Sequence, residues 1–444
     1  MTEQVLRGRV LSFRRRPEGP SDLAACDWFE DGAVHIRDGM IVATGDFAAI
    51  APAGIPVTDH RPHLITAGFI DAHIHFPQGE IVASWGAQLM DWLNTYTFPA
   101  ETRFADPVHA ARIATTFFDL LLMNGTTTAS AFCSVHPESV DAYFSEAGAR
   151  GLRMLGGKVL MDRNAPEALR DTPQSAYDDS AALIGRWHGR GRASYVISPR
   201  FAITSTPEQM EAAQALIAAH PDLHVQTHLS ENDAEIAFAC ALYPQAQGYL
   251  DIYDRYGMLG PKSLLGHSIH LSDAERDRIA ETGAHAVHCP TSNLFLGSGL
   301  FDETALHARG ATCGIATDIG AGMSWSMLRT AGAAYAVAQL QNHKLDPLTG
   351  FWWITRGNAD VLGMTDRIGT LEAGTEADLV VLDSRATPEL ALRMTAAQDL
   401  KDELFALMIL GDDRAVVETY ANGRAVKPAS PPAGQAGRPV TGPL

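Results

Sequence analysis

The sequence has few cysteines, and they are too widely separated to indicate a common structural role. Their number is odd, and they occur at Cys26, Cys133, Cys240, Cys289 and Cys313. This pattern indicates neither a disulfide framework nor a cysteine-based zinc site, and it favours a reducing compartment. The chain also lacks any apolar run approaching about 18 residues, and its first residues contain no apolar stretch. Together these absences predict a cytoplasmic protein.

Positive charge is also scarce. Lys and Arg number 34 against 52 Asp and Glu, which gives a formal net charge of −18. Proteins that bind nucleic acid or anionic membranes need clustered cations, so this balance argues against both kinds of partner. A small molecule remains open as the partner. With 444 residues, 46% of them hydrophobic, the chain can form one large domain and a smaller one.

The two ends of the chain have the patterns of β-structure. Residues 33–42 predict a hairpin that turns at Asp38-Gly39, and residues 377–383 and 415–420 resemble strands, the second followed by a turn at Asn422-Gly423. We therefore expect a small β-sandwich domain composed of residues 1–66 and 366–428. Residues 429–444 are rich in Pro, Gly and Ala and predict a flexible tail.

Between these ends, helical and strand patterns alternate. Asp106-Pro107 predicts the start of a helix, and residues 206–209 and 272–275 have the pattern of capping boxes. About eight apolar strands are predicted, near residues 68–75, 126–132, 152–160, 193–201, 223–228, 264–268, 284–288 and 312–318. This alternation predicts an α/β fold, a (β/α)8 TIM barrel spanning residues 67–365. Barrels of this kind carry their chemistry at the C-terminal ends of the strands.

Metal-binding side chains occur at several of these strand ends. His73 and His75 are two residues apart, so both side chains project from the same face of one strand. His228, His267 and Asp318 each end another predicted strand. Because the strand ends of a barrel converge, we expect these groups to meet at one mouth. Three histidines and one carboxylate fill most of the coordination shell of a divalent ion and leave room for water, as in catalytic zinc or ferrous iron sites.

Several of these segments resemble the amidohydrolase superfamily. The stretches concerned are residues 68–75, 227–232, 266–267, 288–293, 316–318 and 369–383. Residues 73–78, 91–101, 198–201 and 299–301 are similar, more narrowly, to the guanine deaminase family within it. The resemblance covers nearly the whole chain. It implies hydrolytic deamination of guanine to xanthine and ammonia, and a homodimer.

The resemblance also implies a role for each residue of the site. His73, His75, His228 and Asp318 are the expected metal ligands, and Asp318 accepts a proton from the attacking water. Glu231 is expected to carry a proton to the purine ring nitrogen and then to the leaving amine. His267 is expected to stabilise charge on the attacking oxygen.

Two further residues are expected to bind the substrate by the same resemblance. Arg200 offers a planar set of donors suited to a purine carbonyl, and Gln78 offers a donor and an acceptor to a ring edge. Trp92 and Phe98 are expected either to cover a flat purine or simply to pack in the core.

The number of metal ions depends on Lys158. Two-metal members of the superfamily carry a carboxylated lysine on the fourth strand, whereas Lys158 belongs to the predicted third strand and Arg200 ends the fourth. We therefore expect one Zn²⁺ per subunit, with Fe²⁺ as the alternative, and no catalytic role for Lys158. His288 is expected to support the site without binding the metal.

Other functions fit the sequence less well. A related aminohydrolase could act on another amino-purine or on a triazine, and a cyclic-amide hydrolase is a further alternative. A non-catalytic scaffold on the same fold is disfavoured because the complete set of expected ligands is present. His136-Pro137-Glu138 matches half of a cytidine-deaminase zinc signature, but no Pro-Cys-x-x-Cys follows it.

Overall fold

A (β/α)8 barrel forms the centre of the molecule, as the sequence predicted. The computed structural model describes residues 2–85 and 88–429. Eight parallel strands follow one another in the order of the chain. They are β5 (Phe69–His75), β6 (Thr126–Phe132), β7 (Arg153–Gly157), β9 (Ala193–Pro199), β10 (His224–Leu229), β11 (Ser263–His267), β12 (His285–His288) and β13 (Cys313–Ile315). A short strand, β8 (Val159–Leu160), pairs with β9.

The barrel closes between its first and last strands through the segment that carries Asp318. The amide of Asp318 donates to the carbonyl of His73 (3.0 Å), and the amide of His75 donates to the carbonyl of Ile319 (2.7 Å). Every residue of β5, β6 and β10 is buried, as expected for a parallel barrel covered by helices. This closure places Asp318 directly beside the two histidines of β5.

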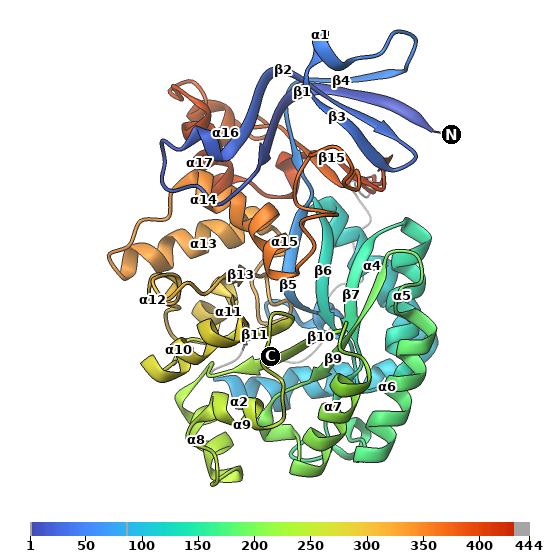
Figure 1. The fold of residues 1–444 in the computed structure, drawn as a ribbon, viewed down its shortest axis with the longest axis vertical. Helices are drawn as coiled ribbons and strands as arrows, with labels where there is room; N and C mark the ends of the chain where they lie inside the picture. The colour runs from blue at the N-terminus through green and yellow to red at the C-terminus, as the bar shows by residue number, and fades with distance from the viewer. Residues whose placement is uncertain (1, 86–87, 430–444) are drawn as a thin grey trace, which may run out of the picture.

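Helices surround the barrel (Figure 1). The longer ones are α4 (Pro107–Met123), α5 (Pro137–Arg150), α6 (Pro173–Trp187), α7 (Pro207–Ala219), α8 (Asp233–Leu242), α9 (Tyr249–Arg255), α10 (Asp273–Thr282) and α13 (Met327–Leu340). The shorter ones are α2 (Leu89–Trp92), α3 (Phe98–Thr102), α11 (Pro290–Phe295), α12 (Glu303–His307), α14 (Pro347–Trp352) and α15 (Asn358–Val361). Another short helix, α1 (Phe47–Ile50), lies outside the barrel, against the strands formed by residues 26–46.

Local sequence signals explain where several helices begin. The Asp106 side chain accepts from the amide of Val108 at the start of α4, and Ser272 and Glu275 form a reciprocal capping box at α10. At α7, Thr206 accepts from the amide of Gln209, but no described residue bonds to the Gln209 side chain. The capping box predicted there was therefore wrong in its second half, because the Gln209 side chain is buried instead of folding back over the helix start.

The two ends of the chain form one seven-stranded sheet above the barrel (Figure 1). Its strands run in the order β16-β15-β14-β4-β1-β2-β3, mostly antiparallel. They are β1 (Glu3–Phe13), β2 (Cys26–Arg37), β3 (Met40–Asp46), β4 (Val57–Ala67), β14 (Leu379–Leu382), β15 (Val416–Ala421) and β16 (Arg424–Ala425). The predicted hairpin turns are present, with positive φ at Asp38, Gly39, Asn422 and Gly423.

The C-terminal part is not purely β-structure. Two helices, α16 (Pro388–Arg393) and α17 (Leu400–Leu410), lie between β14 and β15, and α17 packs on α13 and α14 of the barrel. The domain boundaries at residues 66 and 366 remain a proposal. The predicted tail lies outside the described residues beyond Ala429.

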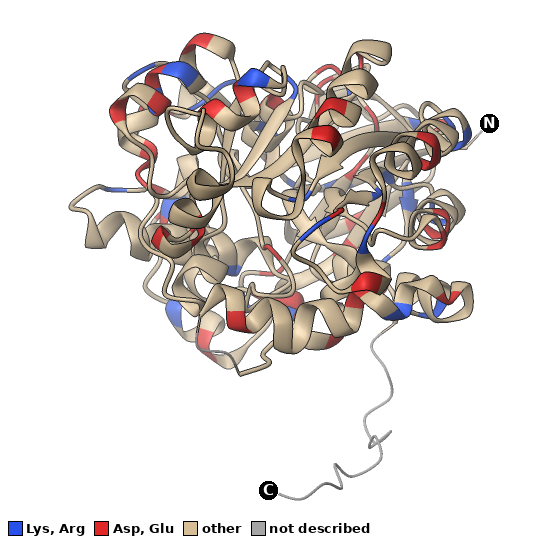
Figure 2. Cartoon of the chain, turned by 90° about the horizontal axis from the view of Figure 1, so that it is seen from below, with Lys and Arg blue, Asp and Glu red and all other residues tan. Residues whose placement is uncertain are grey.

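Charged residues of both signs are interspersed along the outer elements of the molecule (Figure 2). In the described residues, no helix is long and apolar enough to cross a membrane.

Candidate active site

Four side chains from three separate parts of the barrel converge at its C-terminal mouth. His75 Nε2 lies 3.1 Å from His228 Nε2. Asp318 Oδ1 lies 3.4 Å from His73 Nε2 and 3.2 Å from His75 Nε2. All four residues are buried. The donor atoms that the sequence singled out therefore lie around one small volume.

The chemistry of these atoms fits a divalent metal ion. His228 Nδ1 donates to the carbonyl of Arg200 (2.8 Å), which leaves Nε2 as the nitrogen with a free lone pair toward the cluster. Both ring nitrogens of His73 lack a hydrogen-bond partner among the described residues, and buried polar atoms without partners are rare in native proteins. Two sets of side chains have potential ligand atoms close enough together to bind one metal ion, and both contain His73. One set also contains His75 and His228, and the other contains His267, Asp318 and Cys289, a residue that the sequence analysis had not considered.

The electrostatics also favour ligand-competent forms. Burial lowers the pKa of His75 to about 4, and burial with repulsion from His73 lowers that of His228. Both rings are therefore neutral at pH 7, as metal ligands must be. Burial alone would raise the pKa of Asp318, but contacts with His73 and His75 outweigh it and hold that pKa well below its usual range. Asp318 is thus a carboxylate.

The backbone around the site is specialised. His267 and Asp318 have left-handed φ values of 66° and 52°, a conformation that costs non-glycine residues roughly 1–3 kcal/mol and occurs preferentially at functional sites. Gly266 lies beside His73, and a Cβ there would come within 2.5 Å of the imidazole Cε1. Asp71 accepts from the hydroxyl and amide of Thr317, and so joins β5 to the segment that carries Asp318.

Glu231 and His267 face each other next to this cluster. His267 Nε2 lies 3.4 Å from Glu231 Oε2 and 3.8 Å from Asp318 Oδ2, and its Nδ1 donates to Asn293 Oδ1 (2.9 Å). Ser298 donates to Glu231 Oε1 (2.9 Å). Burial and the negative charge of Asp318 raise the pKa of Glu231 to about 8, although the Ser298 hydroxyl opposes this. A carboxyl group that keeps its proton at neutral pH can act as a general acid.

Arg200 and Gln78 border the same cavity. Arg200 follows β9, the fourth barrel strand, and Lys158 lies between β7 and β8 at the third, so the predicted strand count is confirmed. The Lys158 ammonium is fully buried and donates to Asp171 (2.5 Å). Both ends of the Gln78 side chain already bond to the protein, because its amide oxygen accepts from the amide of Gly320 (3.1 Å) and its nitrogen donates to Glu101 (2.9 Å).

The aromatic residues divide between the two roles that the sequence allowed. Trp92 lines the cavity beside Leu89 and Leu93. Phe98 does not line it, and its ring instead covers the Arg200 guanidinium, whose Cζ lies 5.7 Å from the ring centroid. Sequence reasoning missed Glu101, Ser298 and Asn293 as partners of the site, although Glu101 lies within the specific stretch of residues 91–101.

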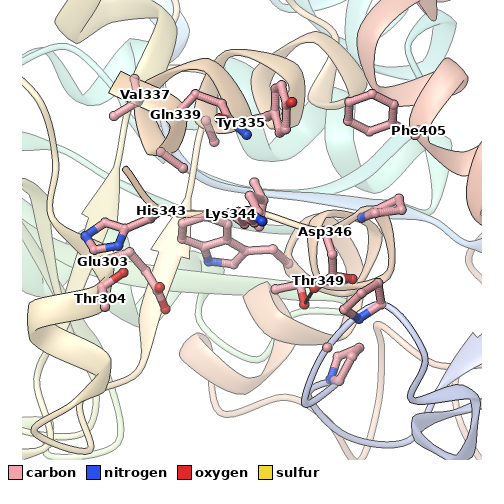
Figure 3. Close-up of a pocket in the computed structure, with 18 of the residues that line it drawn as sticks. Glu303, Thr304, Tyr335, Val337, Gln339, His343, Lys344, Asp346, Thr349 and Phe405 are labelled. Atoms are coloured by element: carbon pink, nitrogen blue, oxygen red, sulfur yellow. Dashed lines mark hydrogen bonds between the residues drawn. The ribbon is translucent and has the colours of Figure 1, made fainter. Parts of the chain in front are cut away.

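A second and larger cavity lies outside this site (Figure 3). It is bordered by charged and aromatic side chains from separate elements, among them Glu303, Tyr335, Lys344, Asp346 and Phe405. His288 borders it and stacks on Phe301, with ring centroids 4.6 Å apart. None of the predicted catalytic, ligand or substrate-binding residues lines this second cavity.

Comparison with known proteins agrees with this geometry. The amidohydrolase family matches residues 64–426, and the chain belongs to this family of metal-dependent hydrolases. Within it, a guanine deaminase of Escherichia coli (strain K12) is 46% identical over 429 residues, which are 96% of this chain and 98% of that protein. The resemblance to guanine deaminases drawn from the sequence motifs is thereby confirmed.

Solved structures give the same result. The E. coli guanine deaminase matches with a TM-score of 0.93 at 45% identity, covering 95% of this chain and 99% of that one. A guanine deaminase from C. acetobutylicum, solved with guanine in its active site, matches with a TM-score of 0.87 at 27% identity, over 96% and 100% of the two chains. An adenosine deaminase from Xanthomonas campestris, solved with bound zinc, matches with a TM-score of 0.82 at 25% identity, over 96% and 92%.

Proposed function

We propose that this protein hydrolyses guanine to xanthine and ammonia. The observation that carries the proposal is the convergence of His73, His75, His228 and Asp318. The last three of these line a cavity that Glu231 and Arg200 also line. The substrate is supported by relatives named as guanine deaminases, among them the E. coli protein at 46% identity and a Mus musculus protein at 32%.

We further propose that the four residues hold one Zn²⁺ per subunit, with Fe²⁺ as the alternative. Three imidazoles and one carboxylate suit either ion. When bound, such an ion supplies Lewis acidity that makes water reactive at neutral pH. The single-metal assignment is supported by Lys158, whose ammonium is engaged with Asp171 at the third strand.

The protein's own groups then move the protons. The Asp318 carboxylate accepts a proton from the water that attacks C2 of guanine, while the protonated Glu231 gives its proton to the adjacent ring nitrogen. Because Nδ1 of His267 donates to Asn293, His267 donates to the attacking oxygen from Nε2 in its imidazolium form and stabilises the charge there. A C–O bond forms at C2, and the new hydroxyl group then gives its proton to the Glu231 carboxylate. Glu231 passes this proton to the exocyclic amine, the C2–N bond breaks, and ammonia leaves. The proton that Asp318 took from the water returns to Glu231, so both carboxyl groups regain their starting states.

Substrate turnover tests this proposal. The purified protein should consume guanine, with loss of its ultraviolet absorption band, and release one ammonia and one xanthine per guanine. The same sample should be assayed against a panel of other amino-purines and amino-triazines, with its metal content measured. Rapid turnover of another amino-heterocycle with guanine inert would replace the substrate assignment by that of a related aminohydrolase. Absence of both metal and turnover would favour the non-catalytic scaffold.

We also propose, on family resemblance alone, that the protein is a homodimer, and, from the scattered cysteines and the lack of a long apolar run, that it is cytoplasmic. Light scattering coupled to size exclusion should give twice the chain mass of 47.7 kDa. A single-chain mass at micromolar concentration would contradict the dimer.

A further inference from the structure

Glu101 lies at a junction between the two residues that we assign to substrate binding. It belongs to the short helix α3 and is fully buried. Arg200 Nη1 donates to both of its carboxylate oxygens (2.9 and 2.8 Å), and Gln78 Nε2 donates to Oε1 (2.9 Å). One oxygen atom of Glu101 therefore holds both side chains at once.

The way in which Glu101 binds Arg200 leaves part of the guanidinium available. An arginine usually meets a carboxylate with two nitrogens, one for each oxygen. Here Nη1 alone contacts both oxygens, and no described residue accepts a hydrogen bond from Nε or Nη2 of Arg200. Because Arg200 borders the cavity, these remaining donors are available to a ligand carbonyl.

Both partners of Glu101 are also tied to the proposed metal ligands. Gln78 Oε1 accepts from the amide of Gly320, two residues after Asp318. The carbonyl of Arg200 accepts from Nδ1 of His228 (2.8 Å). Glu101 itself is anchored, because its carbonyl accepts from the Ser134 hydroxyl (3.0 Å). The carboxylate therefore sets the substrate-binding groups at a fixed place relative to the metal cluster.

Burial of a charged pair stabilises a fold poorly, because loss of hydration offsets most of the attraction. A carboxylate that served only to neutralise Arg200 would not need to accept from Gln78 as well. We propose that Glu101 is a positioning residue for substrate specificity: it orients Arg200 and Gln78 toward the carbonyl side of the purine without touching the substrate. This inference rests on the proposed function. It means that Glu101, which does not line the cavity, determines how well the protein distinguishes purines that have a 6-carbonyl from purines that lack it.

Glu101→Gln tests the proposal, because it keeps the size of the side chain and places an NH₂ group against at least one of the two donors. Two inert purines separate positioning from folding. Hypoxanthine has the 6-carbonyl but lacks the 2-amine, and unsubstituted purine lacks both. As competitive inhibitors of guanine turnover, hypoxanthine should bind the variant roughly 10- to 100-fold more weakly, while the binding of purine changes by less than about threefold. The KM for guanine should rise by a similar factor, with a smaller fall in kcat.

Glu403→Gln is the matched control. Glu403 is another buried carboxylate paired with an arginine, since Arg9 donates to it through Nη1 (2.8 Å) and Nη2 (2.6 Å), but neither residue lines the cavity. That variant should leave both inhibition constants unchanged. Glu101→Asp keeps the charge and should recover part of the hypoxanthine binding, and it replaces Glu101→Gln if the latter does not fold. Equal losses for hypoxanthine and purine, or no loss for either, would overturn the proposal.

The positioning role of Glu101 can be tested even if the proposed function is wrong. If the wild-type protein does not turn over guanine, the substrate assignment falls, and crystal structures of wild type and Glu101→Gln decide the positioning role. Displacement of both Arg200 and Gln78 in the variant, with the histidine cluster unchanged, supports it. Retention of both side chains in place overturns it.

Discussion

The replacement Glu231→Gln removes one proton from the site and leaves its shape almost unchanged. Glu231 Oε1 accepts from Ser298 and Oε2 faces His267 Nε2 at 3.4 Å, and both contacts can be kept by an amide of the same size. Burial raises the pKa of Glu231 to about 8, so the wild-type carboxyl enters the reaction protonated at pH 7. The variant cannot pass this proton to the ring nitrogen.

General acid–base catalysis contributes typically 10²–10⁴-fold, so kcat for guanine should fall by about that factor, or roughly 3–5 kcal/mol in the barrier. The KM and the affinity for hypoxanthine should change by less than about threefold, since the binding contacts remain. Ammonia release should be followed together with metal content in the same preparation. Turnover within about threefold of wild type, at equal metal content, would remove Glu231 from the mechanism.

Two other changes test parts of the site, and a third tests the buried histidine at the start of β10. Arg200→Ala should raise the KM for guanine roughly 10- to 100-fold through loss of charged hydrogen bonds, and an unchanged kcat/KM would show that Arg200 does not meet the substrate. Gly266→Ala should displace His73, because the new Cβ would lie 2.5 Å from its ring, and lower metal affinity about 10- to 100-fold. Gly185→Ala, where a Cβ meets nothing within 4 Å, is its control, and equal metal content in both variants would contradict the argument. Burial lowers the pKa of His224 to about 4, so the folded protein holds this ring neutral where the unfolded chain would protonate it. The free energy of unfolding therefore keeps its full value above pH 6.5 and decreases as the pH falls from 6.5 toward 4. By proton linkage the loss at pH 5 is about 2 kcal/mol, so the free energy of unfolding of His224→Gln in urea should fall about 2 kcal/mol less between pH 7 and 5 than that of wild type, whereas equal falls would refute the effect.

The fold could be predicted largely because the barrel strands have simple signals. Each is a short apolar run bounded by caps and glycines, and the eight predicted segments overlap β5 to β13. The C-terminal ends of barrel strands converge on one mouth. For this reason the sequence alone predicted one shared site for His73, His75, His228, His267 and Asp318. The order of the strands along the chain also placed Lys158 at the third barrel strand and Arg200 at the end of the fourth, as the structure shows.

The remaining contacts depend on how the loops fold over the barrel. Nothing in residues 76–105 alone shows that Glu101 reaches Arg200, since the two are 99 positions apart and their pairing is a tertiary contact. The same holds for Ser298 and Glu231, and for the depth at which Gln78 is buried. The helices α16 and α17 were missed because flanking strands led us to assign the whole C-terminal part to β-structure.

The central claim is that one divalent ion is held by His73, His75, His228 and Asp318, and stepwise metal reconstitution tests it most directly. The protein is stripped with a chelator, Zn²⁺ is added back in fractions of an equivalent, and ammonia release from guanine is measured at each step. We predict no turnover without metal, a linear rise, and saturation at one ion per chain. Full activity in the stripped protein, or a break at two ions per chain, would contradict the account.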